Sequence, residues 1–95
     1  MKICLYGAGA IGCLLGVRLA QKGAEVSVVE VGPVLEAIQK HGLRLRTGEE
    51  TISVPVTATS DPSTLGPQDL VIVAVQGPTL KFIASKLHFL YGPNL

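Results

Sequence analysis

The sequence predicts an α/β protein built on a Rossmann-type, doubly wound parallel sheet. The first observation is that apolar segments suited to buried parallel strands alternate with segments suited to helices along the 95 residues. The second is the glycine-rich segment Gly7–Gly12, which has the spacing G-x-G-x-x-G and lies between the first strand and the first helix. Parallel strands joined by helices have right-handed crossovers, so the helices cover the faces of the sheet.

The first three elements form a strand–helix–strand unit. The nearly continuous apolar run Lys2–Tyr6 predicts a buried strand that begins close to the first methionine. A helix is expected over Ala10–Lys22, with Gly23 as the residue that ends it, and Glu25–Glu30 is the second strand. The apolar face of the helix is formed by Ile11, Leu14, Leu15 and Leu19.

The next segment predicts a short helix followed by a hairpin. Glycine and proline at positions 32 and 33 interrupt the strand pattern and start a helix that runs to about Lys40 and is ended by His41 and Gly42. Leu43–Arg46 and Thr51–Val54 are two short strands joined by a turn at 47–50. Val56–Thr59 is expected to continue the second arm of this hairpin after a proline.

The last third of the chain predicts one more strand and one more helix. Ser60–Gln68 is rich in turn-forming residues and is expected to be a loop or a frayed helical turn. Asp69–Val75 is the clearest strand of the sequence and is expected at the centre of the parallel sheet. A helix is expected over residues 78–89, with a proline at its first position, and a turn at 92–94 follows it.

The glycine segment has the chemistry of a dinucleotide-binding loop. Gly7 permits a tight turn, Gly9 allows the backbone to approach a pyrophosphate, and Gly12 allows the helix to pack close to the sheet. Gly16, one turn later, extends this close contact. The free N–H groups and the positive dipole end of the helix then bind the anion. The predicted cofactor-binding loop, for NAD or NADP, therefore comprises Gly7, Ala8, Gly9, Ala10, Ile11 and Gly12.

Glu30 ends the second predicted strand, about 20 residues beyond the loop, where a carboxylate accepts hydrogen bonds from the adenosine ribose hydroxyls. The same carboxylate repels the 2′-phosphate of NADP. Two unit charges about 4 Å apart at an effective dielectric constant near 20 interact by about 4 kcal/mol, which solvent screening lowers to about 1–2 kcal/mol. This predicts a roughly 10- to 30-fold preference for NAD.

The composition argues against several classes of function. The 8 basic and 7 acidic residues give a net charge of +1, and aromatic residues make up 4% of the chain, so neither a nucleic acid nor an anionic membrane is an expected partner. No segment is long enough to cross a bilayer. Cys4 and Cys13 are expected to be small buried thiols in a reducing cytoplasm, with no disulfide and no metal site.

Three segments resemble the N-terminal domain of the ketopantoate reductase family (2-dehydropantoate 2-reductases), over essentially all 95 residues. They are MKICLYGAGAIGCLLGVRLAQKGAEVSVVE, LEAIQKHGLRLR and DPSTLGPQDLVIVAVQGPTL. The resemblance implies that the protein reduces an α-keto acid by hydride transfer from NADPH, in pantothenate synthesis. The loop Gly7–Gly12 carries over directly as the cofactor-binding segment.

Two positions near the cofactor depart from the family pattern. Val31 stands where family members often have an arginine that binds the 2′-phosphate, and Gln76 stands where they usually have a lysine. Together with Glu30, these residues favour NAD over the NADP of the family. An NAD-dependent D-2-hydroxyacid dehydrogenase of the same architecture is therefore an alternative, and a non-catalytic nucleotide-sensing Rossmann module is another.

The resemblance also implies that the 95 residues are an incomplete, N-terminal dinucleotide-binding domain. In the family, the catalytic lysine and the keto-acid site belong to a helical second domain, so the parent protein is expected to be an enzyme and the 95-residue piece to be inactive. The composition agrees, because 47% hydrophobic residues and a mean hydropathy of +0.46 are high for so small a soluble domain. Apolar surface left exposed predicts self-association into a homo-oligomer.

Overall fold

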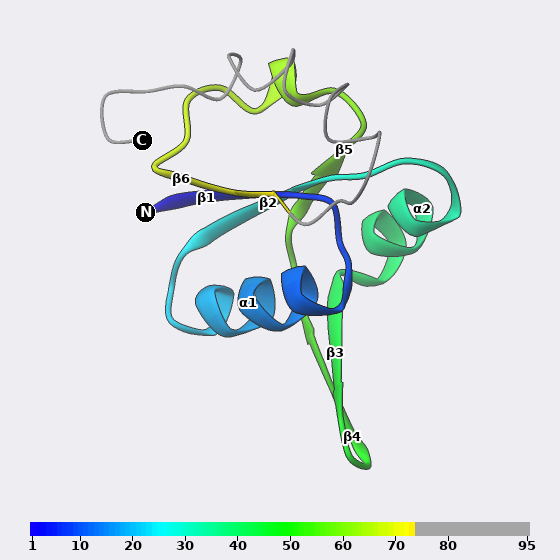
Figure 1. Cartoon of the computed structure of the whole chain (residues 1–95). Coiled ribbons are helices and arrows are strands. Elements are labelled where there is room, and N and C mark those ends of the chain that lie inside the picture. Colours follow the sequence, from blue (N-terminus) through cyan, green and yellow to red (C-terminus); the bar gives the residue numbers. More distant parts are fainter. Residues whose placement is uncertain (74–95) are drawn as a thin grey trace.

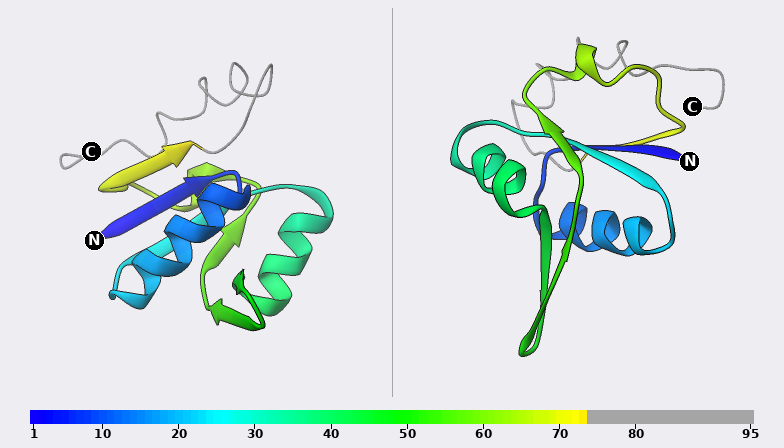
Figure 2. Two further views of the ribbon diagram at one scale, coloured as in Figure 1. Left: turned by 60° about the horizontal axis from the view of Figure 1, so that its bottom comes forward. Right: turned by 180° about the vertical axis from the view of Figure 1, so that it is seen from behind.

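The central feature of the computed structural model, which describes residues 1–73, is a four-stranded parallel sheet in the order β5-β2-β1-β6 (Figure 1). Two helices, α1 and α2, cover one face of this sheet, and a separate antiparallel hairpin, β3–β4, projects beyond them (Figure 2). The elements are β1 Lys2–Tyr6, α1 Ala10–Gln21, β2 Glu25–Val29, α2 Gly32–His41, β3 Leu43–Thr47, β4 Glu50–Val54, β5 Thr57–Thr59, a 3₁₀ turn Pro62–Thr64 and β6 Leu70–Val73.

β1 is the strand around which the core is built. It pairs in parallel with β2 on one side and with β6 on the other. Because successive side chains alternate between the two faces, Leu5 lies in the cluster beneath α1, while Cys4 and Tyr6 lie in a second cluster on the opposite face. All three are buried, as the apolar run predicted.

The helix α1 confirms the predicted helix within one residue at its end, but its buried face differs from the prediction. Leu14 and Leu15 are 44% and 40% exposed, whereas Val17 is fully buried. Gly12 and Gly16 are buried as well, four residues apart on one side of the helix. The helix therefore packs on the sheet through Val17 and through its glycines, whose lack of a side chain permits a close approach. Leu19, also expected on the apolar face, is partly buried against the same core.

The helix α2 and the hairpin follow the predicted boundaries within one residue. Gly42 ends α2 with φ 78° and ψ −179°, a backbone conformation that is essentially restricted to glycine. In the hairpin, Leu43 pairs with Val54, and both side chains are buried at its base. The hydroxyl of Ser53 donates to the carbonyl of His41 at 2.7 Å, which joins the base of the hairpin to the end of α2.

Two predictions about strands are corrected. Val56–Thr59 does not continue the hairpin, because Thr57–Thr59 forms β5 and pairs in parallel with β2 at the edge of the main sheet. The predicted central strand Asp69–Val75 begins at Leu70 and pairs in parallel with β1, but it is an edge strand within residues 1–73. Its last two positions and the predicted helix 78–89 lie outside the residues that the structure describes.

The segment between β5 and β6 crosses the sheet face opposite α1 and α2 (Figure 1). It contains the 3₁₀ turn, in agreement with the predicted loop or frayed turn, and Asp61 caps this turn by accepting from the N–H of Ser63 at 3.0 Å. Leu65 packs against the cluster that contains Cys4 and Tyr6. Within residues 1–73, no helix has both the length and the apolar character needed to cross a membrane.

Candidate dinucleotide-binding site

The loop Gly7–Gly12 lies at the carboxyl end of β1, where parallel α/β sheets bind ligands. Gly7 leaves the strand with φ 97°, a left-handed conformation that favours glycine, and its N–H donates to the carbonyl of Val29 at 2.9 Å. Gly9 is the N-cap of α1, with φ −68° and ψ 178°. The predicted tight turn and the predicted helix start are both confirmed.

The first turn of α1 is suited to bind an anion. The carbonyl of Gly9 accepts the N–H of Cys13 at 2.8 Å, so the N–H groups that precede Cys13 in the helix have no partner within it. Gly9 contributes no side-chain cap, and no acidic residue lies in the first turn. These amides and the positive end of the helix dipole therefore form an electropositive site that suits an anion.

The carboxylate of Glu30 lies beside this loop. One oxygen, Oε2, accepts the N–H of Ala8 at 2.8 Å, and the other, Oε1, accepts the N–H of Val31 at 3.1 Å. The backbone N–H of Glu30 also donates to the carbonyl of Thr59 at 3.1 Å, which fixes the end of β2 to the end of β5. A carboxylate has about four acceptor positions, so two remain for the hydroxyls of a ribose.

Val31 is the N-cap residue of α2, and its side chain is 65% exposed. It follows Glu30 directly and presents an apolar side chain at the position where the family resemblance predicts an arginine. Gln76, the remaining predicted cofactor residue, lies outside the described part of the chain. The structure thus brings together the glycine loop, Glu30 and Val31, and leaves Gln76 as a prediction.

Cys13 also belongs to the site, although the sequence predicted only a small buried thiol. Its S–H donates to the carbonyl of Ala8 at 3.3 Å. Burial and the negative charge of Glu30 raise the pKa of this thiol, so it remains protonated at neutral pH. A sequence signal was available, because side chains in the first turns of a helix lean toward its N-terminus, which places position 13 over the loop.

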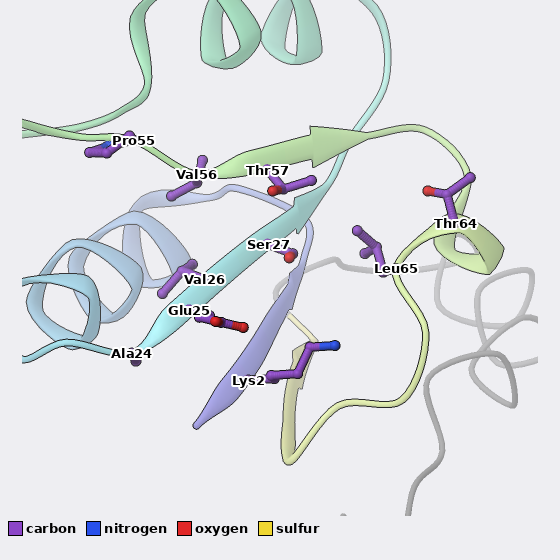
Figure 3. A pocket seen from close by; sticks show the side chains of 10 residues that line it. All are labelled: Lys2, Ala24, Glu25, Val26, Ser27, Pro55, Val56, Thr57, Thr64 and Leu65. Carbon is purple, nitrogen blue, oxygen red and sulfur yellow. The ribbon is translucent and has the colours of Figure 1, made fainter.

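Two of the cavities formed by the described residues lie near opposite ends of the strands. The smaller of these two, of about 330 Å³, adjoins the glycine loop through Ala8 and Cys13 and extends along α2 to Arg44. The larger, of about 580 Å³, lies at the amino ends of β1, β2 and β5, where Lys2 and Glu25 stand at its rim (Figure 3). Because the anion-binding amides are at the carboxyl ends, the smaller cavity is the one that adjoins the candidate site.

Both cysteines are free thiols; Cys4 is buried, as predicted, whereas Cys13 is half-buried. Burial raises the pKa of Cys4 to about 12, which makes it chemically inert at neutral pH. Among residues 1–73, no cluster of three or more histidine, cysteine, aspartate or glutamate side chains is placed to hold a metal ion.

Comparison with known proteins shows the family to which the chain belongs. The family model for ketopantoate reductase PanE/ApbA matches residues 3–94. The chain belongs to the ketopantoate reductase family. Ketopantoate reductases are NAD(P)-dependent oxidoreductases. Their cofactor is of the class that the glycine loop predicted.

A 2-dehydropantoate 2-reductase of Mesorhizobium japonicum (strain LMG 29417 / CECT 9101 / MAFF 303099) is 46% identical over 82 residues, which cover 84% of this chain and 25% of that protein. A crystal structure from Ralstonia solanacearum MolK2, described as a ketopantoate reductase, superposes with a TM-score of 0.90 at 47% identity, over 97% of this chain and 29% of that one. The chain therefore spans between a quarter and a third of the length of these ketopantoate reductases.

A ternary structure of D-mandelate dehydrogenase with NADH and anilino(oxo)acetate also superposes, with a TM-score of 0.82 over 99% of this chain and 31% of that one. At 24% identity, this likeness shows a shared fold alone. The predicted architecture, an α/β Rossmann-type domain of the ketopantoate reductase family, is confirmed.

Proposed function

We propose that the chain is the cofactor-binding part of an oxidoreductase that reduces 2-dehydropantoate or a related 2-keto acid. The observation that carries the proposal is the arrangement at the start of α1, where Gly9 caps the helix without a side chain and the first-turn amides face the carboxyl edge of the sheet. These amides hold the pyrophosphate, and Glu30 holds the adenosine ribose through its remaining acceptor positions.

The reduced nicotinamide supplies the hydride for the keto carbon when the cofactor is bound, and the keto acid takes up a proton to give the hydroxy acid. From the family resemblance we infer that the catalytic lysine and the keto-acid site lie outside the 95 residues. We therefore expect these residues alone to bind dinucleotide without reducing a keto acid. Turnover of 2-dehydropantoate by the purified 95-residue chain with NADH or NADPH would contradict this expectation.

We also propose that NAD is preferred over NADP. The carboxylate of Glu30 repels a 2′-phosphate, and the apolar side chain of Val31 provides no cation to bind one. Titration of the chain with NADH and with NADPH, followed by nicotinamide fluorescence, is expected to give a dissociation constant for NADH roughly 10- to 30-fold lower. Tighter binding of NADPH would overturn this part of the proposal.

Gly9→Ala tests the pyrophosphate site itself. Gly9 is exposed and has φ −68°, so an alanine fits its backbone, but the added methyl group occupies the place where the pyrophosphate approaches. We expect an unchanged melting temperature and a loss of NADH affinity of at least about tenfold. Equal affinity of the variant and the wild type would contradict the proposed site.

We propose that a second copy of the chain packs on exposed apolar side chains, which lie on the solvent side of α1 and along β6. Leu14 and Leu15 are 44% and 40% exposed on α1, and Leu70 is 41% exposed on β6. Sedimentation velocity over a range of concentrations is expected to show a dimer or a larger species. A monomer at all concentrations would overturn this proposal.

A further inference from the structure

Ala8, which lies between the first two glycines of the loop, is held on both sides by the side chains of Glu30 and Cys13. Its N–H donates to Oε2 of Glu30 at 2.8 Å, and its carbonyl accepts the S–H of Cys13 at 3.3 Å. Glu30 is half-buried at the end of β2, and Cys13 is half-buried in the second turn of α1. The two peptide groups that flank Ala8 are therefore each fixed by one side chain.

These contacts constrain the turn that joins β1 to α1. The N–H of Ala8 is occupied by Glu30, whereas the amides of the following helical turn remain open to an anion. A loop that is already ordered loses less conformational entropy when its ligand binds, so its affinity is higher.

We propose that Glu30 and Cys13 form a clamp on Ala8 that holds the glycine loop in its anion-binding conformation before the dinucleotide arrives. The inference rests on the proposed function, and it adds a positioning role for both residues to the ribose contact of Glu30. Cys13 acts only through Ala8, because its thiol is directed to the carbonyl of Ala8 and not to the amides that meet the pyrophosphate.

The first test measures the clamp in the absence of any ligand. Hydrogen exchange of the Ala8 amide, followed by NMR of the ¹⁵N-labelled chain, is expected to be slow in the wild type and at least about tenfold faster in Glu30→Ala, because the acceptor is removed. Glu25→Gln, an exposed carboxylate at the other end of the same strand, is the matched control and leaves the exchange unchanged. Equal exchange rates in Glu30→Ala and the wild type would overturn the clamp.

The second test separates the clamp from the ribose contact by using Cys13. Cys13→Ala removes the donor to Ala8 and is expected to weaken binding of ADP-ribose about 3- to 10-fold, whereas Cys13→Ser keeps a donor and stays within about twofold of the wild type. Binding of adenosine, which has no pyrophosphate, changes in neither variant. Cys4→Ala is the control for loss of a buried thiol, and it lowers the melting temperature without changing ADP-ribose affinity.

The outcomes distinguish the clamp from the function on which it rests. A wild-type chain that binds no ADP-ribose overturns the proposed function and, with it, the role of the clamp in binding. Two results overturn the clamp alone. In the first, Cys13→Ala binds ADP-ribose as tightly as the wild type does. In the second, Cys13→Ser binds ADP-ribose as weakly as Cys13→Ala does.

Discussion

Gly16 of α1 lies directly against Leu43, the first residue of the hairpin. A Cβ atom built on Gly16 would be 2.7 Å from Cδ2 of Leu43 and 2.5 Å from Cδ1 of Leu5, and both leucine side chains are buried. These distances are shorter than any ordinary contact between carbon atoms. The absence of a side chain at this one position therefore lets α1 contact the main sheet and the hairpin at the same time.

Gly16→Val is expected to lower the free energy of unfolding by about 2 kcal/mol. The added atoms must displace Leu5 or Leu43 in a filled core, and overpacking of this kind typically costs about 1–3 kcal/mol. Urea denaturation monitored by circular dichroism measures the change. Leu15→Val, a β-branched substitution at a partly exposed position of the same helix, is the control and is expected to cost less than about 1 kcal/mol.

Gly42→Ala is expected to destabilise the chain more than Gly48→Ala does. Both glycines have positive φ, at 78° and 60°, but a Cβ on Gly42 would lie 2.5 Å from the backbone oxygen of Val54, whereas nothing lies within 4 Å of one on Gly48. We expect a loss of about 1 kcal/mol for Gly48→Ala and at least about 2 kcal/mol for Gly42→Ala. Thermal denaturation measures both losses of stability. Equal losses for the two variants would show that the backbone near Val54 moves away from the added Cβ without a loss of free energy.

The double substitution Glu30→Ala, Val31→Arg is expected to shift the preference of the chain from NADH toward NADPH. The change removes the carboxylate that opposes a 2′-phosphate and adds a cation at the exposed N-cap of α2. The ratio of the two dissociation constants, measured by fluorescence titration, is expected to move by at least about tenfold and to move less at high salt.

A control for the double substitution is Thr51→Arg, which adds a charge to the exposed side of the hairpin, away from the glycine loop. It is expected to leave the cofactor preference unchanged. A shift of equal size in this control would mean that net charge, and not the position next to Glu30, determines the preference.

The stability of the chain is expected to fall with rising pH above about 9 because of Cys4. Burial raises the pKa of this thiol from 9.0 to about 12 in the folded chain, so between these values the unfolded chain loses the proton while the folded chain keeps it. The folded state binds more protons, and its free energy of unfolding therefore falls by up to about 1.4 kcal/mol per pH unit.

Urea denaturation at several pH values from 7 to 11 measures this slope, under reducing conditions. Cys4→Ala has no thiol at this position and is expected to show a shallower decline above about pH 9, while the two proteins have the same pH dependence below it. If the stability of the wild type and of Cys4→Ala changed in parallel over the whole pH range, the pKa of Cys4 would not differ between the folded and unfolded chains.

The sequence by itself determined the elements whose signals are local. A glycine at position 7 adopts the left-handed turn, position 9 caps a helix, and Gly42 ends one, because each depends on backbone conformation within a few residues. The nearly continuous apolar run of β1 was sufficient to predict a buried parallel strand for the same reason. The expected site residues Gly7, Gly9 and Glu30 meet because the ends of adjacent parallel strands lie together.

The tertiary structure alone decided which neighbours these elements have. Nothing in the short segment Thr57–Thr59 distinguishes a hairpin arm from an edge strand beside β2, because both are extended and differ only in a partner far away in the sequence. Leu14 and Leu15 were expected to be buried, but the close approach at Gly16 turns the opposite side of the helix toward the sheet. The contact of Glu30 with Ala8 likewise required the packed fold, since only the pairing of β1 with β2 brings a carboxylate 22 positions away to the loop.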